Sequence, residues 1–464
     1  MSLLDHLAAQ VSALKRSHPS PLHIVVAYSA GIDSHVLLHA LWQLKHAHIS
    51  SFQLSALYIH HGLSDNADKW QQHCETVCGE LEVEFDSAKV FVDVASGKGI
   101  EAQARDARYA KLVEIAPPGS VVMLAQHQDD QLETVLLQLK RGAGPKGLSG
   151  MGRCFSRAKP SGHQEKVHFF RPLLEISQGQ IHRYADEHAL VWQEDESNQN
   201  IDFERNFIRR DVSPLLNQRW PHFARSVSRS ALLCAQQQAL LDEVTQEKLH
   251  SLLNPNNTLS VELLLALTEP WRLQVVRMWL DTQNILSPSR AILAQLSKEL
   301  LLAAQDASPV IQWQKWQFRR FENALYVIAI PEQVSPCETF IQPPEVQKLP
   351  LSLGEVALRR GQLAEVSDVS LNINDLDIGP ISVVFGGFSQ RFTPQDAPQS
   401  KPLKQWFKEW KIPPWERANI AIIRQGEQII GLLINGRFVA GKSNGHKTAT
   451  QNKLDSSGTL TYQK

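Results

Sequence analysis

Short apolar runs rich in β-branched residues alternate with longer helix-like stretches in the first part of the chain. The apolar runs are 24–27, 52–59, 81–90 and 121–125, and the helix-like stretches between them are 34–46, 65–80 and 100–115. Each of these stretches is long enough to cross a sheet, so the alternation predicts parallel strands joined by helices that cover both faces. Ligands of such a sheet bind at the carboxyl ends of its strands.

The β pattern stops after Asn217. The α/β domain would therefore span residues 1–217, and residues 218–330 predict a mainly helical domain with tryptophans in its core. Five prolines in 331–350 disfavour a helix or a central strand and predict a linker. Residues 351–464 predict a small α+β domain. Its expected elements are strands near 381–385, 420–424 and 428–434 and a helix over 401–411.

Composition narrows the class of protein. A length of 464 residues suggests about three domains, and 43% hydrophobic residues with a net charge of -1 exclude a disordered chain. No apolar run approaches the roughly 18 residues of a membrane helix, so we expect a cytoplasmic protein without membrane contact. Five cysteines without regular spacing argue against a disulfide framework. Because the total charge is balanced, any nucleic-acid surface must be a local patch.

The first strand-to-helix junction has the chemistry of a phosphate site. Its residues are Ser29, Ala30, Gly31, Ile32, Asp33 and Ser34. Small residues let main-chain N–H groups approach an anion, and a helix N-terminus carries partial positive charge. The Asp33 carboxylate would repel phosphate unless a divalent cation lay between them, so Asp33 indicates Mg²⁺. A tight turn with Asp or Ser as a helix cap is the simpler alternative.

A second phosphate motif lies near the other end of the chain, where residues 436–443 match G-x-x-x-x-G-K-S letter for letter. Asn444 and Gly445 follow where an apolar helix would have to begin. We therefore interpret this segment as a basic β-turn region and not as a nucleotide site.

A cluster of titratable residues follows the apolar run 121–125. His127, Asp129 and Asp130 come at the end of the predicted strand, and Glu133 lies one helical turn further on. Adjacent carboxylates are costly to bring together unless a metal ion or cationic groups compensate them. The pattern favours a functional site over a solvated face.

These motifs carry a family resemblance. The loop from Ser29 to Ser34 resembles the S-G-G-x-D-S signature of the PP-loop ATP pyrophosphatases, with Ala30 in place of a glycine. If position 30 has a positive φ, alanine costs about 1 to 2 kcal/mol there relative to glycine. Nearly the whole chain is similar to the tRNA(Ile)-lysidine synthetase family. The matching segments are H-x-D-D-x-x-E-T (127–134), R-G-x-G-x-x-G-L-x-G-M (141–151), I-H-H-G-L (59–63), 101–109, 171–174, 192–209 and 404–417.

The resemblance implies an adenine nucleotide alpha hydrolase-like catalytic domain and an ATP-dependent ligase. In that reaction, O2 of the wobble cytidine of tRNA(Ile) with a CAU anticodon attacks the α-phosphate of ATP, and pyrophosphate leaves into the loop from Ser29 to Ser34. Free L-lysine then displaces AMP from C2. ATP and Mg²⁺ would be required, with Mg²⁺ held by Asp33.

The resemblance also suggests roles for further residues. Asp129 and Asp130 are candidates for positioning the metal and for holding or deprotonating the lysine ammonium. Arg108 and Arg205, with Arg105 as a further candidate, would stabilise phosphate charge. The nucleotide pocket would include His60 and His127. Gln126 occupies the family's first histidine position and receives no role.

Two basic segments could contact the RNA. Residues 137–172 hold eight Lys or Arg and one acid in a glycine-rich segment that reads as a flexible loop, although a merely solvated loop would look similar. In the helix 401–411, lysines fall on one face and apolar residues on the other. The expected RNA-binding residues are Lys140, Arg141, Lys146, Arg153, Lys401, Lys404, Lys408 and Lys411.

Other readings stay open at this point. The chain could be another PP-loop tRNA-modifying enzyme such as a thiolase, although no C-x-x-C pair is visible, or a tRNA-binding protein whose nucleotide site has degenerated. Cys74, Cys78 and the neighbouring His73 could form half a metal site, but a buried cysteine pair is the favoured interpretation. The sequence leaves the oligomeric state open, with a homodimer among the options.

Overall fold

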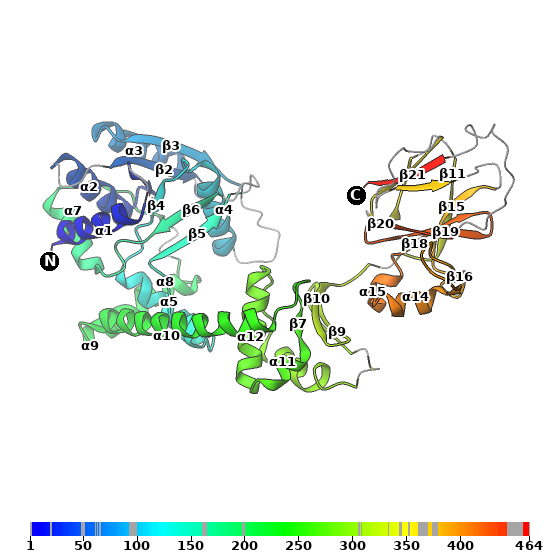
Figure 1. Cartoon of the computed structure of the whole chain (residues 1–464). Coiled ribbons are helices and arrows are strands. Elements are labelled where there is room, and N and C mark those ends of the chain that lie inside the picture. The colour runs from blue at the N-terminus through cyan, green and yellow to red at the C-terminus, as the bar shows by residue number, and fades with distance from the viewer. Residues whose placement is uncertain are drawn as a thin grey trace. The chain divides into compact units, whose positions relative to one another are not determined.

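The computed structural model describes most of the chain in two compact units, Met1–Val244 and Thr245–Lys464 (Figure 1). The described residues are 2–18, 21–47, 52–60, 62, 64, 66–91, 100–159, 165–196, 200–304, 307, 309–332, 334–342, 346–350, 353–360, 370–373, 379–442 and 458–463. Within these residues, no helix has the length and apolar character that crossing a membrane requires.

The first unit is built around one six-stranded sheet with the strand order β3-β2-β1-β4-β6-β5. All neighbours are parallel except β5, which pairs antiparallel with β6. The elements of this unit are α1 (Leu3–Ser17), β1 (His23–Ala27), α2 (Ile32–His46), β2 (Gln53–His60), α3 (Ala67–Glu80), β3 (Glu84–Lys89), α4 (Ile100–Ile115), β4 (Val121–Met123), α5 (Gln128–Lys140), α6 (Pro145–Leu148), β5 (Cys154–Ala158), β6 (Lys166–Phe170), α7 (Gln178–Glu187), α8 (Glu204–Phe207), the π-helix η2 (Ile208–Val212), α9 (Ser213–Arg219) and the start of α10 (Phe223–Leu252). The expected parallel α/β sheet is confirmed.

Helices cover both faces of this sheet because side chains alternate along each strand. Ile24 and Val26 of β1 belong to the core that α1, α2, α3 and α7 complete, whereas Val25 packs with Tyr109 and Leu112 of α4 on the opposite face. In the sheet, β1 lies between β2, which is the next strand in the sequence, and β4. The loops after β1 and β4 therefore meet at the point where the strand order reverses, which is the usual ligand site of such sheets.

The basic segment 137–172 differs from the expected flexible loop. It contains α6 and the hairpin of β5 and β6, and β6 extends the sheet by pairing with β4. Val167, Phe169 and Phe170 are buried, while Lys166 and His168 are exposed. This alternation is only five residues long and lies in a segment rich in glycine and basic residues, so composition hides the strand.

The second unit begins with a helical part and continues into a β-rich part. The helical part contains β7 (Leu259–Ser260), α11 (Val261–Ala266), α12 (Glu269–Thr282), α13 (Arg290–Gln295), the π-helix η3 (Leu296–Leu300), β8 (Val310–Trp313), β9 (Trp316–Phe321) and β10 (Ala324–Ala329). Trp279 and Trp313 lie in its core as expected, but Trp220 at the start of the predicted domain is 53% exposed.

The β-rich part packs two antiparallel sheets, β11-β15-β18-β19-β20 and β12-β13-β21-β14. Val383 and Ile423 of the larger sheet face Leu358 and Leu460 of the smaller one, whereas Phe407 of α14 covers the opposite face. The elements are β11 (Cys337–Ile341), β12 (Val346–Lys348), β13 (Glu355–Arg360), β14 (Ser370–Ile373), β15 (Ile381–Phe385), β16 (Arg391–Phe392), β17 (Lys401–Pro402), α14 (Leu403–Glu409), α15 (Pro414–Arg417), β18 (Ala421–Gln425), β19 (Gln428–Ile434), β20 (Arg437–Ala440) and β21 (Gly458–Gln463).

The segment 331–350 is not a free linker. It supplies β11 and β12, and each forms the edge of its sheet. Proline is tolerated next to an edge strand because the missing N–H would face solvent. The proline density therefore excludes a central strand, as expected, but does not exclude an edge strand.

Candidate functional site

The loop between β1 and α2 has the backbone of an anion site. Gly31 caps α2 without a side-chain hydrogen bond, so no side chain occupies the first amides of the helix. Ala30 has a φ of 63°, the conformation that favours glycine. The amide of Ser29 donates to Oγ of Ser34 at 3.1 Å, and this hydroxyl donates to the carbonyl of Gly31 at 3.0 Å. The loop is thus held open by its two serines.

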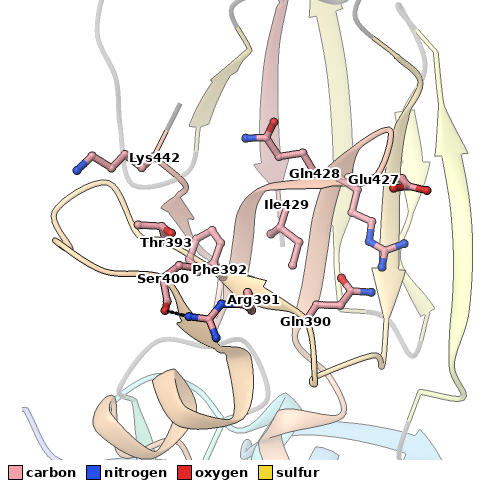
Figure 2. Close-up of a pocket in the computed structure, with 10 residues that line it drawn as sticks. Gln390, Arg391, Phe392, Thr393, Ser400, Glu427, Gln428, Ile429 and Lys442 are labelled. Carbon is pink, nitrogen blue, oxygen red and sulfur yellow. Dashed lines mark hydrogen bonds between the residues drawn. The ribbon is translucent and has the colours of Figure 1, made fainter. Parts of the chain in front are cut away.

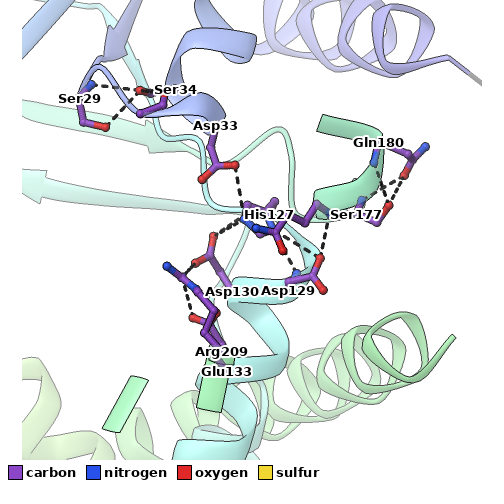
Figure 3. A network of polar contacts seen from close by, with 12 residues as sticks. Ser29, Asp33, Ser34, His127, Asp129, Asp130, Glu133, Ser177, Gln180 and Arg209 are labelled. Carbon is purple, nitrogen blue, oxygen red and sulfur yellow. Dashed lines mark hydrogen bonds and ion pairs between the residues drawn. The ribbon is translucent and has the colours of Figure 1, made fainter. Parts of the chain in front are cut away.

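Asp33 projects from the first turn of α2 toward the end of β4 (Figure 3). Its Oδ1 atom is buried without a hydrogen-bond partner among the described residues and lies 3.6 Å from Nε2 of His127. Burial raises the pKa of Asp33, although the nearby imidazole of His127 acts in the opposite direction. A carboxylate oxygen without a hydrogen bond can serve as a ligand for a cation.

His127 links the two loops. It follows β4 and caps α5, and the amide of Asp129 donates to its Nδ1 at 3.2 Å. The ring nitrogens lie 3.5 to 3.6 Å from carboxylate oxygens of Asp33, Asp129 and Asp130. Burial lowers the pKa of His127, but these three carboxylates outweigh it and raise the pKa to about 9. A ring protonated on both nitrogens would lose the hydrogen bond from the Asp129 amide, because it would have no acceptor nitrogen.

Two arginines form ion pairs with the acids of α5, and Figure 3 shows one of them, Arg209, beside Asp130 and Glu133. Oδ1 of Asp130 accepts hydrogen bonds from Arg205 and Arg209 at 3.0 and 3.1 Å. Glu133 accepts from Nε of Arg205 at 2.7 Å and from Nε of Arg209 at 2.6 Å. Burial raises the pKa of Asp130, but His127 and Arg205 keep the net shift downward. Sequence reasoning chose Arg205 but missed Arg209, although a spacing of four places both arginines on one helical face.

The side chain of Asp129 is more exposed than that of Asp130. One oxygen accepts from the amide of Gln178 at 2.9 Å, and no hydrogen bond to its other oxygen is present among the described residues. Asp129 also lines a cavity of about 970 Å³, together with residues of α7 and α10. Because four carboxylates face two arginines and one histidine, the site keeps an excess of negative charge that suits a cation or an ammonium group.

Two other residues expected at the nucleotide site have different neighbours. Nε2 of His60 lies 3.2 Å from Oδ1 of Asp68, and Nδ1 accepts the amide of Gly62 at 3.1 Å. In the described part of the chain, no hydrogen bond or ion pair joins His60 to the loop from Ser29 to Ser34. Arg108 lies on α4 with its guanidinium over the ring of Tyr109. Gln126 accepts a hydrogen bond from Nε of Arg171 at 3.0 Å, so this position supports an arginine.

The cysteines behave as expected for a buried pair. Cys74 and Cys78 are fully buried free thiols on α3. Burial raises the pKa of both thiols, and that of Cys78 reaches about 12. Among the described residues, no group of three or more His, Cys, Asp or Glu side chains is arranged to hold a metal.

Several expected RNA-binding cations already have acidic partners. Lys140 pairs with Glu204 at 2.5 Å, and Arg153 pairs with Glu175. In the C-terminal domain, α14 is shorter than the expected helix, and Lys401 and Lys411 fall outside it. Lys401 pairs with Glu409 at 2.7 Å, and Lys411 pairs with Glu322 at 3.3 Å.

Other expected RNA-binding residues stay exposed. Arg141 and Lys146 are exposed near α6, and Lys404 and Lys408 are exposed on α14. No ion pair to Lys404 or Lys408 exists within the described ranges. The opposite, apolar face of α14 is buried through Leu403, Trp406 and Phe407, as expected. Lys404 and Lys408 therefore form the displayed basic face.

A polar hollow of about 540 Å³ lies nearby in the C-terminal domain (Figure 2). Arg391, Arg424 and Lys442 line it, with Glu427 as an acidic neighbour. Lys442 belongs to the G-x-x-x-x-G-K-S match, whose first glycine forms the β19–β20 turn with a φ of 81°. That segment is a hairpin up to Ala440, in agreement with the β-turn interpretation, and Ser443 lies outside the described residues.

Comparison with known proteins identifies the class first. Residues 3–216 match the PP-loop domain, in agreement with the sheet order and the loop after β1, which defines an ATP-using PP-loop enzyme. Residues 259–326 match the TilS substrate binding domain, and residues 381–454 match the TilS substrate C-terminal domain.

Relatives with an assigned name fix the family. The tRNA(Ile)-lysidine synthase of Proteus mirabilis (strain HI4320) is 39% identical over 90% of this chain and 92% of its own length. The corresponding protein of Serratia proteamaculans (strain 568) is 38% identical over 94% of this chain and 95% of its own length. The chain therefore belongs to the tRNA(Ile)-lysidine synthase family, and the resemblance seen in the motifs is confirmed.

Proposed function

We propose that this protein ligates free L-lysine to C2 of the wobble cytidine in tRNA(Ile) with a CAU anticodon, with conversion of ATP to AMP and pyrophosphate. The observation that carries this proposal is the meeting of two loops at the switch point of the sheet. The open amide loop after β1 and the acid cluster after β4 are joined by the 3.6 Å approach of Asp33 to His127. A site for leaving pyrophosphate and a site for a nucleophilic amine thus share one edge.

The donor set fits Mg²⁺. Asp33 offers a buried carboxylate oxygen that has no hydrogen bond among the described residues, at the N-terminus of a helix whose amides suit phosphate. Oxygen ligands at such a position are the ones Mg²⁺ prefers, with phosphate oxygens completing its shell. When bound, the ion offsets charge on the phosphates. Ser29 and Ser34 would contribute hydroxyl contacts to the departing pyrophosphate.

Asp129 is the better placed of the two aspartates to hold lysine. Both oxygens of Asp130 are engaged, one by the two arginines and the other by the amide of His127 at 3.0 Å. Asp129 keeps an open oxygen beside the cavity of about 970 Å³, which has room for an amino acid and a base. Its carboxylate would orient the ammonium and accept a proton from it, because only the neutral amine attacks C2.

Arg205 and Arg108 would act on opposite sides of this cluster. Arg205 fixes Asp130 and Glu133 and so positions α5 under the reacting groups. Burial lowers the pKa of Arg108, and the positive charge of the nearby Arg205 lowers it further. An anionic group next to Arg108 would relieve both effects. We further place the reaction in the cytoplasm, which the five free thiols support.

Two half-reactions separate the roles. tRNA-dependent pyrophosphate release without lysine reports adenylation, and incorporation of labelled lysine into tRNA with a CAU anticodon reports the complete reaction. Asp33→Asn should abolish both signals. Asp129→Asn should preserve most pyrophosphate release while lowering lysine incorporation at least tenfold and raising the KM for lysine.

Asp186→Asn on the exposed surface of α7 is the matched control and should leave both signals unchanged. Sulfur transfer instead of lysine transfer would replace the proposed reaction by that of a thiolase. RNA binding without any pyrophosphate release would show that the protein binds tRNA but does not catalyse the reaction.

A further inference from the structure

Four arginines gather around one buried tyrosine on the α4 side of the catalytic sheet. Arg105, Arg108 and Arg157 place their guanidinium carbons 5.3, 5.7 and 4.6 Å from the centre of the Tyr109 ring. Arg171 lies 4.6 Å from the ring of Phe155, which contacts Tyr109 edge-on. Tyr109 is 1% exposed, so the ring forms a floor under these side chains. We call Arg105, Arg108, Arg157 and Arg171 the arginine cluster.

The arginine cluster lacks acidic partners. No Asp or Glu in the described part of the chain lies within ion-pair distance of any of its four members, in contrast to Arg205 and Arg209. Nε of Arg108 is buried without a hydrogen-bond partner. Arg171, which is 6% exposed, uses Gln126 and the carbonyl of Gly152. Like charges that are buried together are costly unless an anion compensates them.

The position of the arginine cluster separates it from the triphosphate site. The strand order places β4 between β1 and β6, so the exit of β6 lies roughly 10 Å from the exit of β1 at about 4.8 Å per strand. Arg171 follows β6, whereas the phosphate loop follows β1. Moreover, α4 and α2 cover opposite faces of the sheet. The acids that follow β4 lie between the arginine cluster and the phosphate loop.

Guanidinium groups bind phosphate through paired hydrogen bonds. ATP and the RNA backbone both carry phosphate, but ATP already has the loop after β1. From this arrangement we propose that the arginine cluster binds a backbone phosphate of the tRNA beside the nucleotide that is modified. The proposal rests on the function proposed above. It places the cytosine base over the acids that follow β4. The backbone phosphate of that nucleotide would lie on the α4 side of the sheet, and the triphosphate of ATP would lie on the α2 side.

Tyr109 would act as a positioning residue in this arrangement. Its ring face attracts the guanidinium groups and holds them apart from one another. Burial raises the pKa of its hydroxyl, but the charges of Arg105, Arg171 and Arg108 outweigh burial and lower it. Because Tyr109→Phe keeps the ring and all four cations, it should change RNA affinity less than twofold. The cations, not the hydroxyl, would carry the recognition.

Protein variants give the first test. Arg105→Met and Arg157→Met should each weaken tRNA binding at least fivefold and reduce the slope of log K against log salt by about 0.7 to 0.9. The KM for ATP should stay within twofold. Arg16→Met removes an exposed arginine of α1 and is the matched control, with unchanged tRNA affinity expected. A higher KM for ATP with unchanged tRNA affinity would assign the cluster to ATP, and no change in either would make it structural; both results overturn the proposal.

The RNA side gives a test that does not depend on the folding of a variant. An anticodon stem-loop with neutral methylphosphonates on either side of the wobble cytidine should bind the wild-type protein at least fivefold more weakly than the unmodified stem-loop. The same replacement at a stem position should have a smaller effect. Equal binding of all three RNAs overturns the proposal. Binding is measured without lysine, so loss of lysine transfer with intact discrimination would contradict only the proposed function.

Discussion

Glu133 provides a quantitative test of the ion-pair network on α5. Its side chain is 2% exposed and accepts three hydrogen bonds from two arginines, at 2.6, 2.7 and 3.0 Å. Glu133→Gln keeps the shape but places an amide donor against guanidinium donors. Removal of one member of a buried ion pair costs about 3 to 5 kcal/mol. Because both arginines retain Asp130 and Arg209 is 35% exposed, we expect the free energy of unfolding to fall by about 2 to 3 kcal/mol.

Urea denaturation followed by circular dichroism measures this change. Lys140→Met is the control, since its ion pair with Glu204 leaves both side chains about 60% exposed and should be worth less than about 0.5 kcal/mol. The double variant Glu133→Gln with Arg209→Met should be less destabilised than the sum of the single variants, by about 1 kcal/mol or more. A loss below 0.5 kcal/mol for Glu133→Gln, or strict additivity, would refute the view that this network is a tightly coupled buried unit.

Three further predictions concern other parts of the chain. Because Ala30 has a φ of 63°, Ala30→Val should destabilise the protein by about 2 kcal/mol or more in urea denaturation, whereas Ala30→Gly should change stability by less than about 1 kcal/mol. Burial, together with His73 and His39, lowers the pKa of His35 from 6.5 to about 4. Below pH 6.5 the unfolded chain therefore binds a proton that the folded chain does not, and this residue should cost about 1 to 2 kcal/mol of stability as the pH falls toward 4. His35→Gln should flatten the plot of stability against pH. Lys404→Met with Lys408→Met should weaken tRNA binding severalfold in a filter-binding assay and reduce its salt dependence, with Lys401→Met as a weaker comparison because Lys401 already pairs with Glu409.

The sequence predicted those parts of the fold that depend on local pattern. Apolar runs of four to ten residues indicated the first four strands, and the loop signature, which has glycine at position 30, raised the question of a positive φ that Ala30 indeed has. The cluster of His127, Asp129 and Asp130 could be expected because these residues are adjacent in the chain. Each of these signals is contained within about ten residues.

The parts that escaped prediction depend on distant residues. The partners of Glu133 lie at positions 205 and 209, and nothing near Glu133 in the sequence specifies that two arginines will cover it. The same holds for the arginine cluster, which α4, β5 and the end of β6 bring to one tyrosine. Lys140 and Arg153 were expected to contact RNA because charge counting cannot detect an acid supplied by another element.

The placement of β21 has a consequence for biosynthesis. This strand, Gly458–Gln463, lies between β13 and β14, and within the described residues β14 pairs with no other strand. While the ribosome is still translating the residues before Gly458, the nascent chain cannot close this sheet, and Leu358 lacks the neighbour Leu460 that buries it in the finished core. Premature termination or proteolytic trimming just ahead of Gly458 would therefore leave an unpaired β edge exposed to aggregation and degradation, even though every residue of the catalytic sheet had already been made.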